Sequence, residues 1–460
     1  MGYNKLPDLP VEISGDANNY LKMAYNIMRY GTFSKVMKVE GKAESLVPTA
    51  FREPGYPAFL SLGMLVSPKF RNLTEEEFVT EEGRSKITSY ALTFMEMLIL
   101  LSTSFISMWT VFCVTRKRLP SIIALFGVGL SPVLMESTHW YLTENLAALL
   151  LLLASIFLYN AVKHGRTRDY IFLGFLLGIL TLTRGIFQFV WLPISVFLLL
   201  SNIKTTSMKK TITAIFLFIF VYFAVITPWM TRNYFHFDRF YITERGGCVL
   251  MQRSNYNTMT TKEYFAFFLY WTPSKYAKKL CSELFEEDEI SRLIGKNPNG
   301  FKGSARRLRS DLIEEYGNET EADKVLLYIA LGKIASHPFR HLLVSIPIAW
   351  RGIFIEQNLY PGMSRFNLAP IMSIVLFFCY FCFIIKSMIR REWDFLALVF
   401  PSAYLFGMHV LLTHNNYRYN EPLIPVLWIT TILFLTPPIS KLATRIRDRF
   451  KTPDAKESGN

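Results

Sequence analysis

Residues 91–114 read ALTFMEMLILLSTSFISMWTVFCV, a stretch long enough to cross a lipid bilayer. A helix that faces water needs a polar side, and this stretch has none. About 20 consecutive apolar residues span the hydrocarbon core of a membrane. A second run of the same kind covers residues 145–162. The sequence therefore predicts an all-α polytopic membrane protein with soluble inserts.

The composition supports this prediction. Of 460 residues, 51% are hydrophobic and 15% aromatic, and the mean hydropathy is +0.25. These values exclude a disordered chain, a small disulfide-stapled protein and an ordinary cytosolic enzyme. The formal net charge is +14. A nucleic-acid-binding protein would gather this charge in one patch, whereas here it falls in short clusters between apolar runs, so we expect no nucleic-acid partner.

These basic clusters set the expected topology, because cytoplasmic loops carry an excess of Lys and Arg. The clusters lie at residues 116–118, 163–168, 204–210, 386–391 and 441–451. We predict membrane spans at residues 89–113, 121–135, 144–162, 170–183, 186–200, 211–230, 367–385, 395–412 and 422–436. If residues 116–118 lie in the cytoplasm, these spans place each of the other basic clusters in the cytoplasm as well. We expect a bundle of about 9–11 transmembrane helices.

This topology divides the chain into five parts. Residues 1–87 form a first extracytoplasmic loop, 88–230 membrane helices, 231–366 an extracytoplasmic α-rich insert, 367–440 the C-terminal membrane helices, and 441–460 a basic cytoplasmic tail. The apolar segment 342–355 is short and carries Arg351, so we interpret it as a re-entrant or interfacial helix. An outer first loop needs a membrane helix before it, and we expect one to be missing from this reading frame.

Cysteine usage adds one open question. Cys379 and Cys382 lie in an apolar run and are expected to pack there rather than to do redox chemistry. Cys248 and Cys281 lie in the largest polar insert and can pair as a disulfide if that insert is extracytoplasmic.

Ionisable and aromatic side chains recur on the expected outer face. They are Asp16, Arg52, Glu144, Arg184, Arg232 and, on the last outer loop, His414, Tyr417 and Arg418. Arginine suits phosphate, because its planar fork bonds two oxygens and it stays charged. A carboxylate can deprotonate a hydroxyl, and aromatic rings suit the membrane interface and the faces of sugars. Together they fit a substrate with a lipid tail, a phosphate and a sugar.

Each of these features also has a simpler interpretation. Asp16 can cap a helix, Glu144 can sit in a first turn near the helix dipole, and the turn at residues 54–57 can be only a turn. Arginines at the ends of spans can extend to the interface without binding a ligand. His139 and His414 are expected to be solvated, and no cluster of Cys, His, Asp and Glu has metal-ligand spacing. Asp16 and Glu144 sharing an ion remains a minor alternative.

Taken in order, the motifs resemble the GT-C superfamily of polyprenyl-phosphate-sugar-dependent glycosyltransferases. The resemblance is to bacterial members related to the protein O-mannosyltransferases and the aminoarabinose transferases of lipid A. It rests on Asp16 to Tyr20, REPGYP at residues 52–57, TE at 143–144, LTR at 182–184, PWMTRN at 228–233, and RYNEPLIP at 418–425. The chain departs from the family at Ala17, where members often carry Glu, and at Asn19, where some carry Arg.

The resemblance implies specific roles. Asp16 would be the catalytic general base, and Arg52, Arg184, Arg232 and Arg418 would bind the donor phosphate. Tyr20, Tyr56, Glu144 and Tyr417 would contact substrate. The expected activity is inverting transfer of a sugar from a polyprenyl-phosphate donor to an acceptor hydroxyl outside the cell (inner) membrane, with no cofactor. The alternatives are a lipid-linked sugar flippase, which would be expected to show internal repeats, and an O-antigen-type polymerase.

Overall fold

The computed structural model describes residues 15–37, 46–79, 90–202, 207–295, 297–355 and 369–436. Within these ranges the regular elements are α-helices and short 3-10 helices, and no β-strand is formed. The all-α class is therefore confirmed. The expected basic tail at 441–460 lies outside the described residues, as do parts of the first loop and the residues around 356–368.

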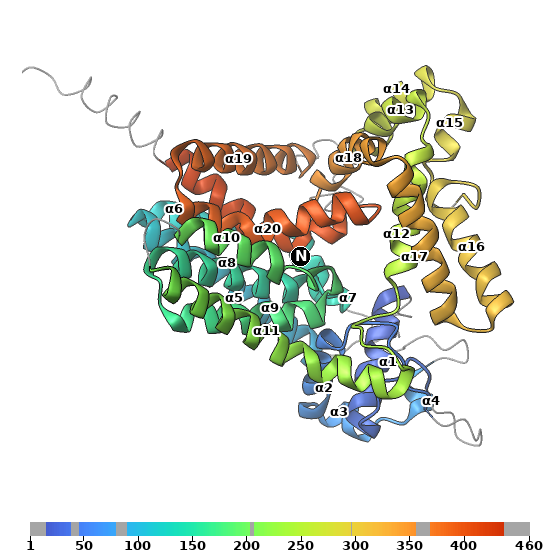
Figure 1. The fold of residues 1–460 in the computed structure, drawn as a ribbon, viewed down its shortest axis with the longest axis horizontal. Coiled ribbons are helices and arrows are strands. Elements are labelled where there is room, and N and C mark those ends of the chain that lie inside the picture. Colours follow the sequence, from blue (N-terminus) through green and yellow to red (C-terminus); the bar gives the residue numbers. More distant parts are fainter. Residues whose placement is uncertain are drawn as a thin grey trace, which may run out of the picture.

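The helices gather in one bundle with two additions at one end (Figure 1). The bundle consists of α5 (Tyr90–Thr115), α6 (Arg118–Gly129), α7 (Pro132–Trp140), α8 (Glu144–His164), α9 (Thr167–Thr183), α10 (Trp191–Asn202), α11 (Met208–Phe237), α19 (Ala369–Arg390), α20 (Trp393–Leu412) and a helix over residues 424–436. The 3-10 helices η1 (Gly185–Phe187) and η3 (Tyr417–Leu423) connect some of these.

Six stretches of the described chain are long and apolar enough to cross a membrane, namely α5, α6 with α7, α8, α11, α19 and α20. Three other expected spans correspond to shorter helices, which are α9, α10 and residues 424–436. These three share the hydrophobic core of the long helices. The expected run at 121–135 is broken near Leu130, because Gly129 ends α6 and Pro132 begins α7.

α8 is the central helix of the bundle. Its apolar window is 56% buried, against 22–44% in the other candidate membrane spans. Ala147, Leu151, Ala154 and Leu158 recur every three or four residues, so they form one buried face. Gly165, with φ of 63°, ends the helix in the left-handed conformation. The outer helices instead expose large apolar side chains such as Phe105 and Trp109, as expected where lipid is the solvent.

The helix ends place charge at opposite ends of the bundle. Arg116 follows α5, Lys163 lies in the last turn of α8, Lys209 begins α11 and Arg390 ends α19. The opposite ends of the neighbouring helices carry Glu144, Arg184, Arg232 and Arg418. Glu144, Arg184 and Arg418 meet at this second end of the bundle, and which end faces the outside stays a prediction from the basic clusters.

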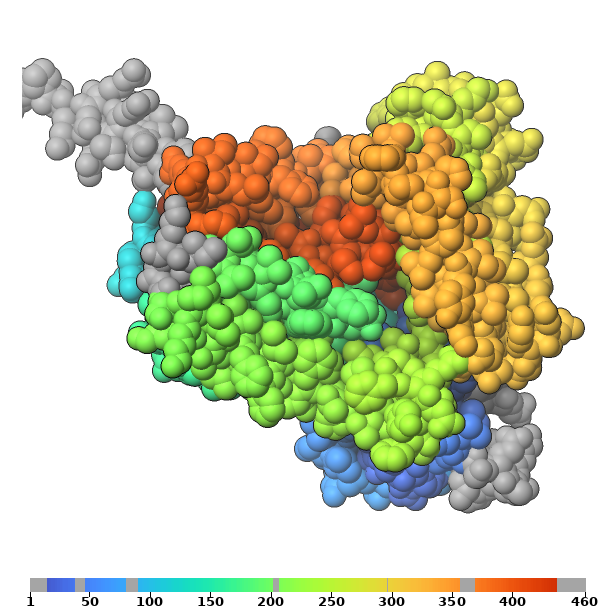
Figure 2. All heavy atoms as spheres, in the orientation of Figure 1, coloured from blue at the N-terminus to red at the C-terminus, as the bar shows by residue number. Residues whose placement is uncertain are grey.

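The first addition contains α1 (Gly15–Tyr30), α2 (Gly55–Val66), α3 (Pro68–Asn72) and α4 (Glu75–Phe78). The second contains α12 (Gly246–Asn255), η2 (Tyr256–Thr258), α13 (Thr261–Trp271), α14 (Lys275–Leu284), α15 (Glu287–Ser291), α16 (Phe301–Tyr316), α17 (Glu319–Ser336) and α18 (Pro338–Ile353). Its yellow and orange helices project beyond the bundle (Figure 2). The expected domain boundary at 230–231 falls inside α11, which continues to Phe237.

α18 corresponds to the segment expected to be re-entrant or interfacial. It has 16 residues and two faces. Phe339, Leu342 and Ile346 are exposed on one face, whereas Val344 and Ile348 are buried on the other. A helix this short and two-sided is suited to lie in the membrane interface rather than to cross.

The cysteines of the insert do not pair. Cys281 is buried in one hydrophobic cluster with Phe267 and Phe301, and Cys248 packs on a different one with Leu250 and Leu326. Both are free thiols. The disulfide considered from the sequence is therefore wrong, because the two residues belong to separate cores.

Candidate functional site

Five ionisable side chains from distant parts of the chain meet at one end of the bundle. Asp16 comes from α1, Arg52 from the turn before α2, Glu144 from the start of α8, Arg184 from the end of α9, and Arg418 from η3. These five residues are called the acid–arginine cluster below. Arg418 contacts both carboxylates, so the cluster is continuous.

Asp16 is held by two guanidinium groups. Arg52 Nη2 donates to Oδ1, and Arg418 Nη2 donates to Oδ2 at 2.9 Å. Burial raises the pKa of Asp16, but the nearby charges of Arg52, Arg245 and Arg418 outweigh this effect and lower its pKa to about 2. Asp16 lies in the first turn of α1, where the helix dipole also favours a negative charge. Its carboxylate is therefore ionised at any physiological pH.

The other half of the cluster is a deeply buried ion pair. Arg184 Nη2 lies 2.9 Å from Glu144 Oε1, with side-chain exposures of 10% and 2%. Arg418 Nε lies 3.3 Å from the same oxygen. Arg184 also donates to Thr143 Oγ1 at 3.1 Å and to the Tyr419 carbonyl at 2.9 Å. Arg184 is thus fixed on several sides rather than extended into solvent.

The local fold explains how the first loop reaches α9. Glu53 Oε1 accepts a hydrogen bond from the Gly185 amide at 3.0 Å, which ties the turn before α2 to the end of α9. Gly55 packs directly on the same end, since a Cβ there would lie 2.8 Å from the Leu182 carbonyl oxygen. This contact requires glycine and sets the position of Arg52 relative to Arg184.

The three tyrosines expected to bind substrate differ in position. Tyr20 lies under Arg52, with the guanidinium carbon 5.2 Å from its ring centroid. Tyr56 is fully buried, and its hydroxyl donates to Glu96 in α5 at 2.7 Å. Tyr56 therefore supports Tyr20, with ring centroids 5.3 Å apart, instead of facing a ligand. Tyr417 is half-buried next to Arg418.

Arg232 is not part of the cluster. Its Nη1 donates to the Thr49 carbonyl at 3.0 Å and to Asn233 Oδ1 at 2.8 Å. The guanidinium lies 4.8 Å from the Trp229 ring centroid. These contacts tie α11 to the segment before Arg52, so the structure gives Arg232 a supporting position rather than the expected place among the phosphate-binding arginines.

Two cations and a histidine near the cluster were missed or misjudged from the sequence. Arg245 and Lys302 both act electrostatically on Asp16. Lys302 Nζ lies 3.1 Å from His414 Nε2. Burial and the nearby charges of Arg306, Arg351 and Arg418 lower the pKa of Lys302 to about 8. His414 was expected to be solvated, but it is only 3% exposed. Nothing in their sequence context distinguishes Arg245 and Lys302 from other basic residues of the insert.

Glu421 is a further buried carboxyl near the cluster. It accepts a hydrogen bond from Ser137 at 3.1 Å. Burial, with the nearby charge of Glu144, raises the pKa of Glu421 well above its usual value. The cluster itself contains two carboxyl groups and three arginines, so positive charge is in excess there.

Three polar atoms of the cluster lack hydrogen-bond partners. Arg52 Nε, Glu144 Oε2 and Arg418 Nε are buried and make no hydrogen bond with the described residues. Buried polar atoms are nearly always satisfied in a native protein, so such orphans mark a place where a ligand or water completes the network. Within the described ranges, no group of three or more His, Cys, Asp and Glu side chains could hold a metal ion.

Known proteins offer one sequence match and several distant structural ones. Residues 89–231 match the family model described as dolichyl-phosphate-mannose-protein mannosyltransferase. No curated protein matches the chain.

Among solved structures, the archaeal oligosaccharyltransferase AglB from Archaeoglobus fulgidus, in complex with an inhibitory peptide and a dolichol-phosphate, is 12% identical, with 99% of this chain and 50% of that chain covered and a TM-score of 0.48. The oligosaccharyltransferase of the same organism in the apo form is 14% identical, with 98% of this chain and 50% of that chain covered and a TM-score of 0.46. ArnT from Cupriavidus metallidurans in the apo state is 10% identical, with 97% of this chain and 78% of that chain covered and a TM-score of 0.35. The chain thus spans about half the length of the two oligosaccharyltransferase chains.

The family match covers α5 to the greater part of α11, including Glu144 and Arg184, and leaves Asp16, Arg52 and Arg418 outside. Over residues 89–231 the chain is thus similar to the dolichyl-phosphate-mannose-protein mannosyltransferases, and the resemblance to GT-C glycosyltransferases inferred from its sequence is confirmed for this part.

Proposed function

We propose that this multi-pass membrane protein transfers a sugar from a polyprenyl-phosphate donor to an acceptor hydroxyl at the outer face of the cell (inner) membrane. The observation that carries the proposal is the meeting of Asp16 with Arg52 and Arg418, which join it from positions 36 and 402 residues away. The family match of residues 89–231, which contain Glu144 and Arg184, supports the same chemistry.

The donor phosphate would lie against Arg52, Arg184 and Arg418, with Lys302 nearby. Negative charge grows on the phosphate as it leaves, so fixed cations lower the barrier most at that stage. The unpaired Arg52 Nε supplies a buried donor for one phosphate oxygen. The lipid tail of the donor would run along the apolar outer surface of the bundle.

Asp16 would act as the general base. The acceptor oxygen forms a bond to the anomeric carbon while the bond from that carbon to the phosphate oxygen breaks. The bonding electron pair leaves with the phosphate, and the hydroxyl proton passes to the Asp16 carboxylate. The attack comes from the face opposite the phosphate, so the anomeric configuration inverts.

The low pKa of Asp16 bears on this mechanism. A carboxylate bound by Arg52 and Arg418 is a weak base, because both arginines favour its charged form. A phosphate that binds the same guanidinium groups competes for them and raises the basicity of Asp16. The base would therefore become effective when the donor is in place, which limits wasteful hydrolysis.

The decisive experiment is Asp16→Asn, assayed in membranes with a radiolabelled lipid-linked sugar. We expect the transfer rate to fall by roughly 10²- to 10⁴-fold at equal protein level, as is usual when a general base is removed. Asp238→Asn is the matched control, because Asp238 is exposed and caps α11 in a left-handed conformation that Asn also adopts.

Normal transfer by Asp16→Asn would end the assignment of Asp16. Movement of the intact donor across the bilayer without release of its sugar would instead favour a flippase. Donors that carry hexosyl or pentosyl groups, compared in the same assay, identify the sugar. The molecule that receives the radiolabel identifies the acceptor.

A further inference from the structure

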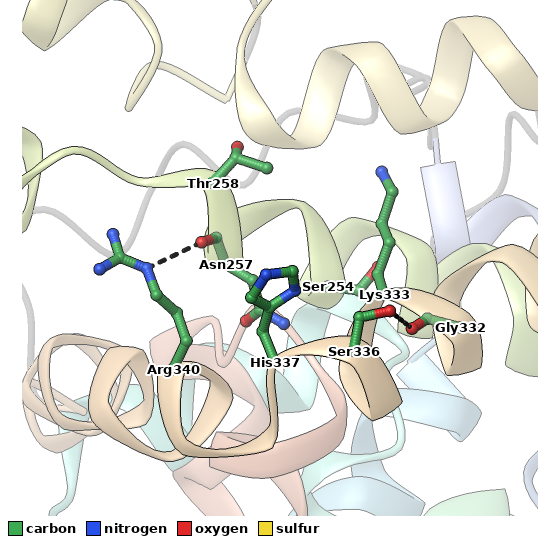
Figure 3. Close-up of a pocket in the computed structure, with 8 residues that line it drawn as sticks. All are labelled: Ser254, Asn257, Thr258, Gly332, Lys333, Ser336, His337 and Arg340. Carbon is green, nitrogen blue, oxygen red and sulfur yellow. Dashed lines mark hydrogen bonds between the residues drawn. The ribbon is translucent and has the colours of Figure 1, made fainter.

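A cavity lies in the second insert, and none of its lining residues belongs to the acid–arginine cluster. It has a volume of about 630 Å³ and lies where α12 and η2 face the junction of α17 and α18. Its lining residues are drawn in Figure 3. This volume falls in the range of small-molecule sites.

The described lining of this cavity contains cations and no carboxylate. Lys333, His337 and Arg340 come from α17 and the start of α18, and they face Ser254, Asn257 and Thr258 (Figure 3). Burial lowers the pKa of Lys333, and no charged neighbour contributes to this shift. Lys333 is half-buried, and an anion in the cavity would stabilise its charge.

Arg253 adds buried positive charge behind the cavity. It is fully buried, and it donates to the carbonyls of Val410 and His341 and to Ser345 rather than to a carboxylate. Among the hydrogen-bond partners of Arg253, none is a carboxylate, so Arg253 adds positive charge to this region.

The cations keep hydrogen-bond donors free. Lys333 Nζ donates once, to Asn255 Oδ1 at 2.8 Å, and an ammonium group has three donors. Arg340 uses Nε for the Asn257 carbonyl at 3.0 Å and Nη2 for the Met259 carbonyl, and its Nη1 makes no bond with the described residues. These two side chains can bind an anionic group together.

The hydroxyl groups of the cavity offer acceptors instead. Ser336 donates to the Gly332 carbonyl at 2.7 Å, Ser254 to Met251 at 3.1 Å and Thr258 to Asn255 at 2.8 Å. Ser254 is fully buried, so only the exposed oxygens of Ser336 and Thr258 remain as acceptors for donors on a ligand. Thr258 Oγ1 also accepts a hydrogen bond from Arg292 Nη2 at 3.3 Å, which leaves one of its lone pairs. Asn257 Nδ2 is a buried donor without a partner. The cavity thus combines cations with hydroxyl acceptors.

From this pairing we infer that the cavity binds a phosphorylated sugar, with the phosphate at Lys333 and Arg340 and sugar hydroxyls at Thr258 and Ser336. A bare phosphate would leave the acceptor oxygens unused, and a neutral sugar would leave the cations unpaired. The inference does not depend on the function of the acid–arginine cluster.

The test is lysine footprinting on the purified full chain in detergent. An amine-reactive acetylating reagent is added with glucose 6-phosphate, inorganic phosphate or glucose, and acetylation is read at each lysine by mass spectrometry. We expect glucose 6-phosphate to slow the acetylation of Lys333 by roughly tenfold at saturation, consistent with the strength of a charge-assisted hydrogen bond. Glucose should have no effect, and inorganic phosphate should require higher concentrations.

The same spectra contain the controls. Lys324 lies on α17 but outside this cavity, so its rate should not change. Lys302 lies near the acid–arginine cluster, so its acetylation rate measures phosphate binding at that cluster, independently of the rate at Lys333. The variant Arg340→Gln should require about tenfold more glucose 6-phosphate for the same protection of Lys333.

Because Arg340 also anchors backbone, a second variant guards against misfolding. Ser336 is exposed, and Ser336→Asp adds a negative charge at the rim that should abolish protection, whereas Ser336→Asn should retain most of it. An unchanged Lys333 rate with glucose 6-phosphate, or equal protection in Ser336→Asp, would overturn the inference. Equal potency of inorganic phosphate and glucose 6-phosphate would overturn its sugar component.

Discussion

Arg418 and Asp16 are 402 residues apart in the sequence, and yet Arg418 Nη2 donates a 2.9 Å hydrogen bond to Asp16 Oδ2. Arg418 also lies 3.3 Å from Glu144 through Nε, so one guanidinium joins the two carboxylates of the cluster. The helix α1, the central helix α8 and the 3-10 helix η3 are coupled through this one side chain.

Replacing Arg418 should therefore impair transfer more than replacing an isolated arginine. We expect Arg418→Gln to lower kcat/KM by roughly 10²- to 10³-fold, the usual effect of removing one preorganised electrostatic contact. Arg418→Lys should recover only part of this loss, because an ammonium group cannot bond both acids through a planar fork. Steady-state kinetics with a lipid-linked donor measures both. Arg307→Gln, on the exposed face of α16, is the control, and an Arg418→Gln rate equal to that control would refute the proposed role.

The pair of Glu144 and Arg184 should contribute to stability as a unit. Both side chains are buried, so removing one leaves an uncompensated charge, which typically costs about 3–5 kcal/mol. We expect Glu144→Gln and Arg184→Gln each to lower the unfolding temperature strongly, and the double variant to lose much less than the sum. Thermal unfolding in detergent provides the comparison. Additive losses would mean that the two residues act independently.

The pH dependence of donor binding should reflect Lys302 rather than Asp16. The pKa of Lys302 is lowered to about 8, mainly by burial, so its charge is lost as pH rises through that value. We expect KM for the donor to increase between pH 7 and pH 9. Lys302→Gln should bind donor weakly and show a flatter profile over this range. A wild-type KM that does not change from pH 7 to pH 9 would exclude Lys302 from phosphate binding.

Asp16 should affect the pH dependence of the stability of the fold only at strongly acidic pH. Its pKa in the folded protein, about 2, lies below the ordinary value of 3.8. A lowered pKa means that ionised Asp16 stabilises the fold above the ordinary value, and this contribution is lost as pH falls toward 2. We expect the wild type to lose more stability than Asp16→Asn between pH 4 and pH 2, as measured by thermal unfolding. Identical acid profiles would show that the two arginines do not favour the charged form.

Gly55 tests whether the contact of α2 with α9 positions Arg52. A Cβ at this residue would lie 2.8 Å from both the Leu182 carbonyl oxygen and Thr183 Oγ1. We expect Gly55→Ala to destabilise the protein by about 1–3 kcal/mol, as overpacking usually does, and to reduce transfer further by displacing Arg52. Gly407→Ala is the control, since a Cβ there meets nothing within 4 Å. A Gly55→Ala protein with normal stability and rate would show that the contact is dispensable.

The class of the protein, an all-α bundle of membrane helices, could be predicted from the sequence alone, and the basic clusters predict its orientation. Long apolar runs must form helices in lipid, because every backbone polar group has to be satisfied within the segment, and the basic clusters mark one side. This is why residues 91–114 and the cluster at 116–118 predicted α5 and its orientation. The sequence also shows, in order along the chain, the motifs that contain Asp16, Arg52, Glu144, Arg184 and Arg418.

Only the tertiary structure decided which of these side chains meet. Arg232 and Tyr56 carry the same local signals as Arg52 and Tyr20, but α11 directs Arg232 to Thr49, and Tyr56 is buried against Glu96. Lys302 has no distinguishing sequence context, and it meets His414 only because α16 packs beside the loop that follows α20. Contacts between residues hundreds of positions apart depend on how helices pack, and packing is set by side-chain shape across the whole core rather than by any local pattern.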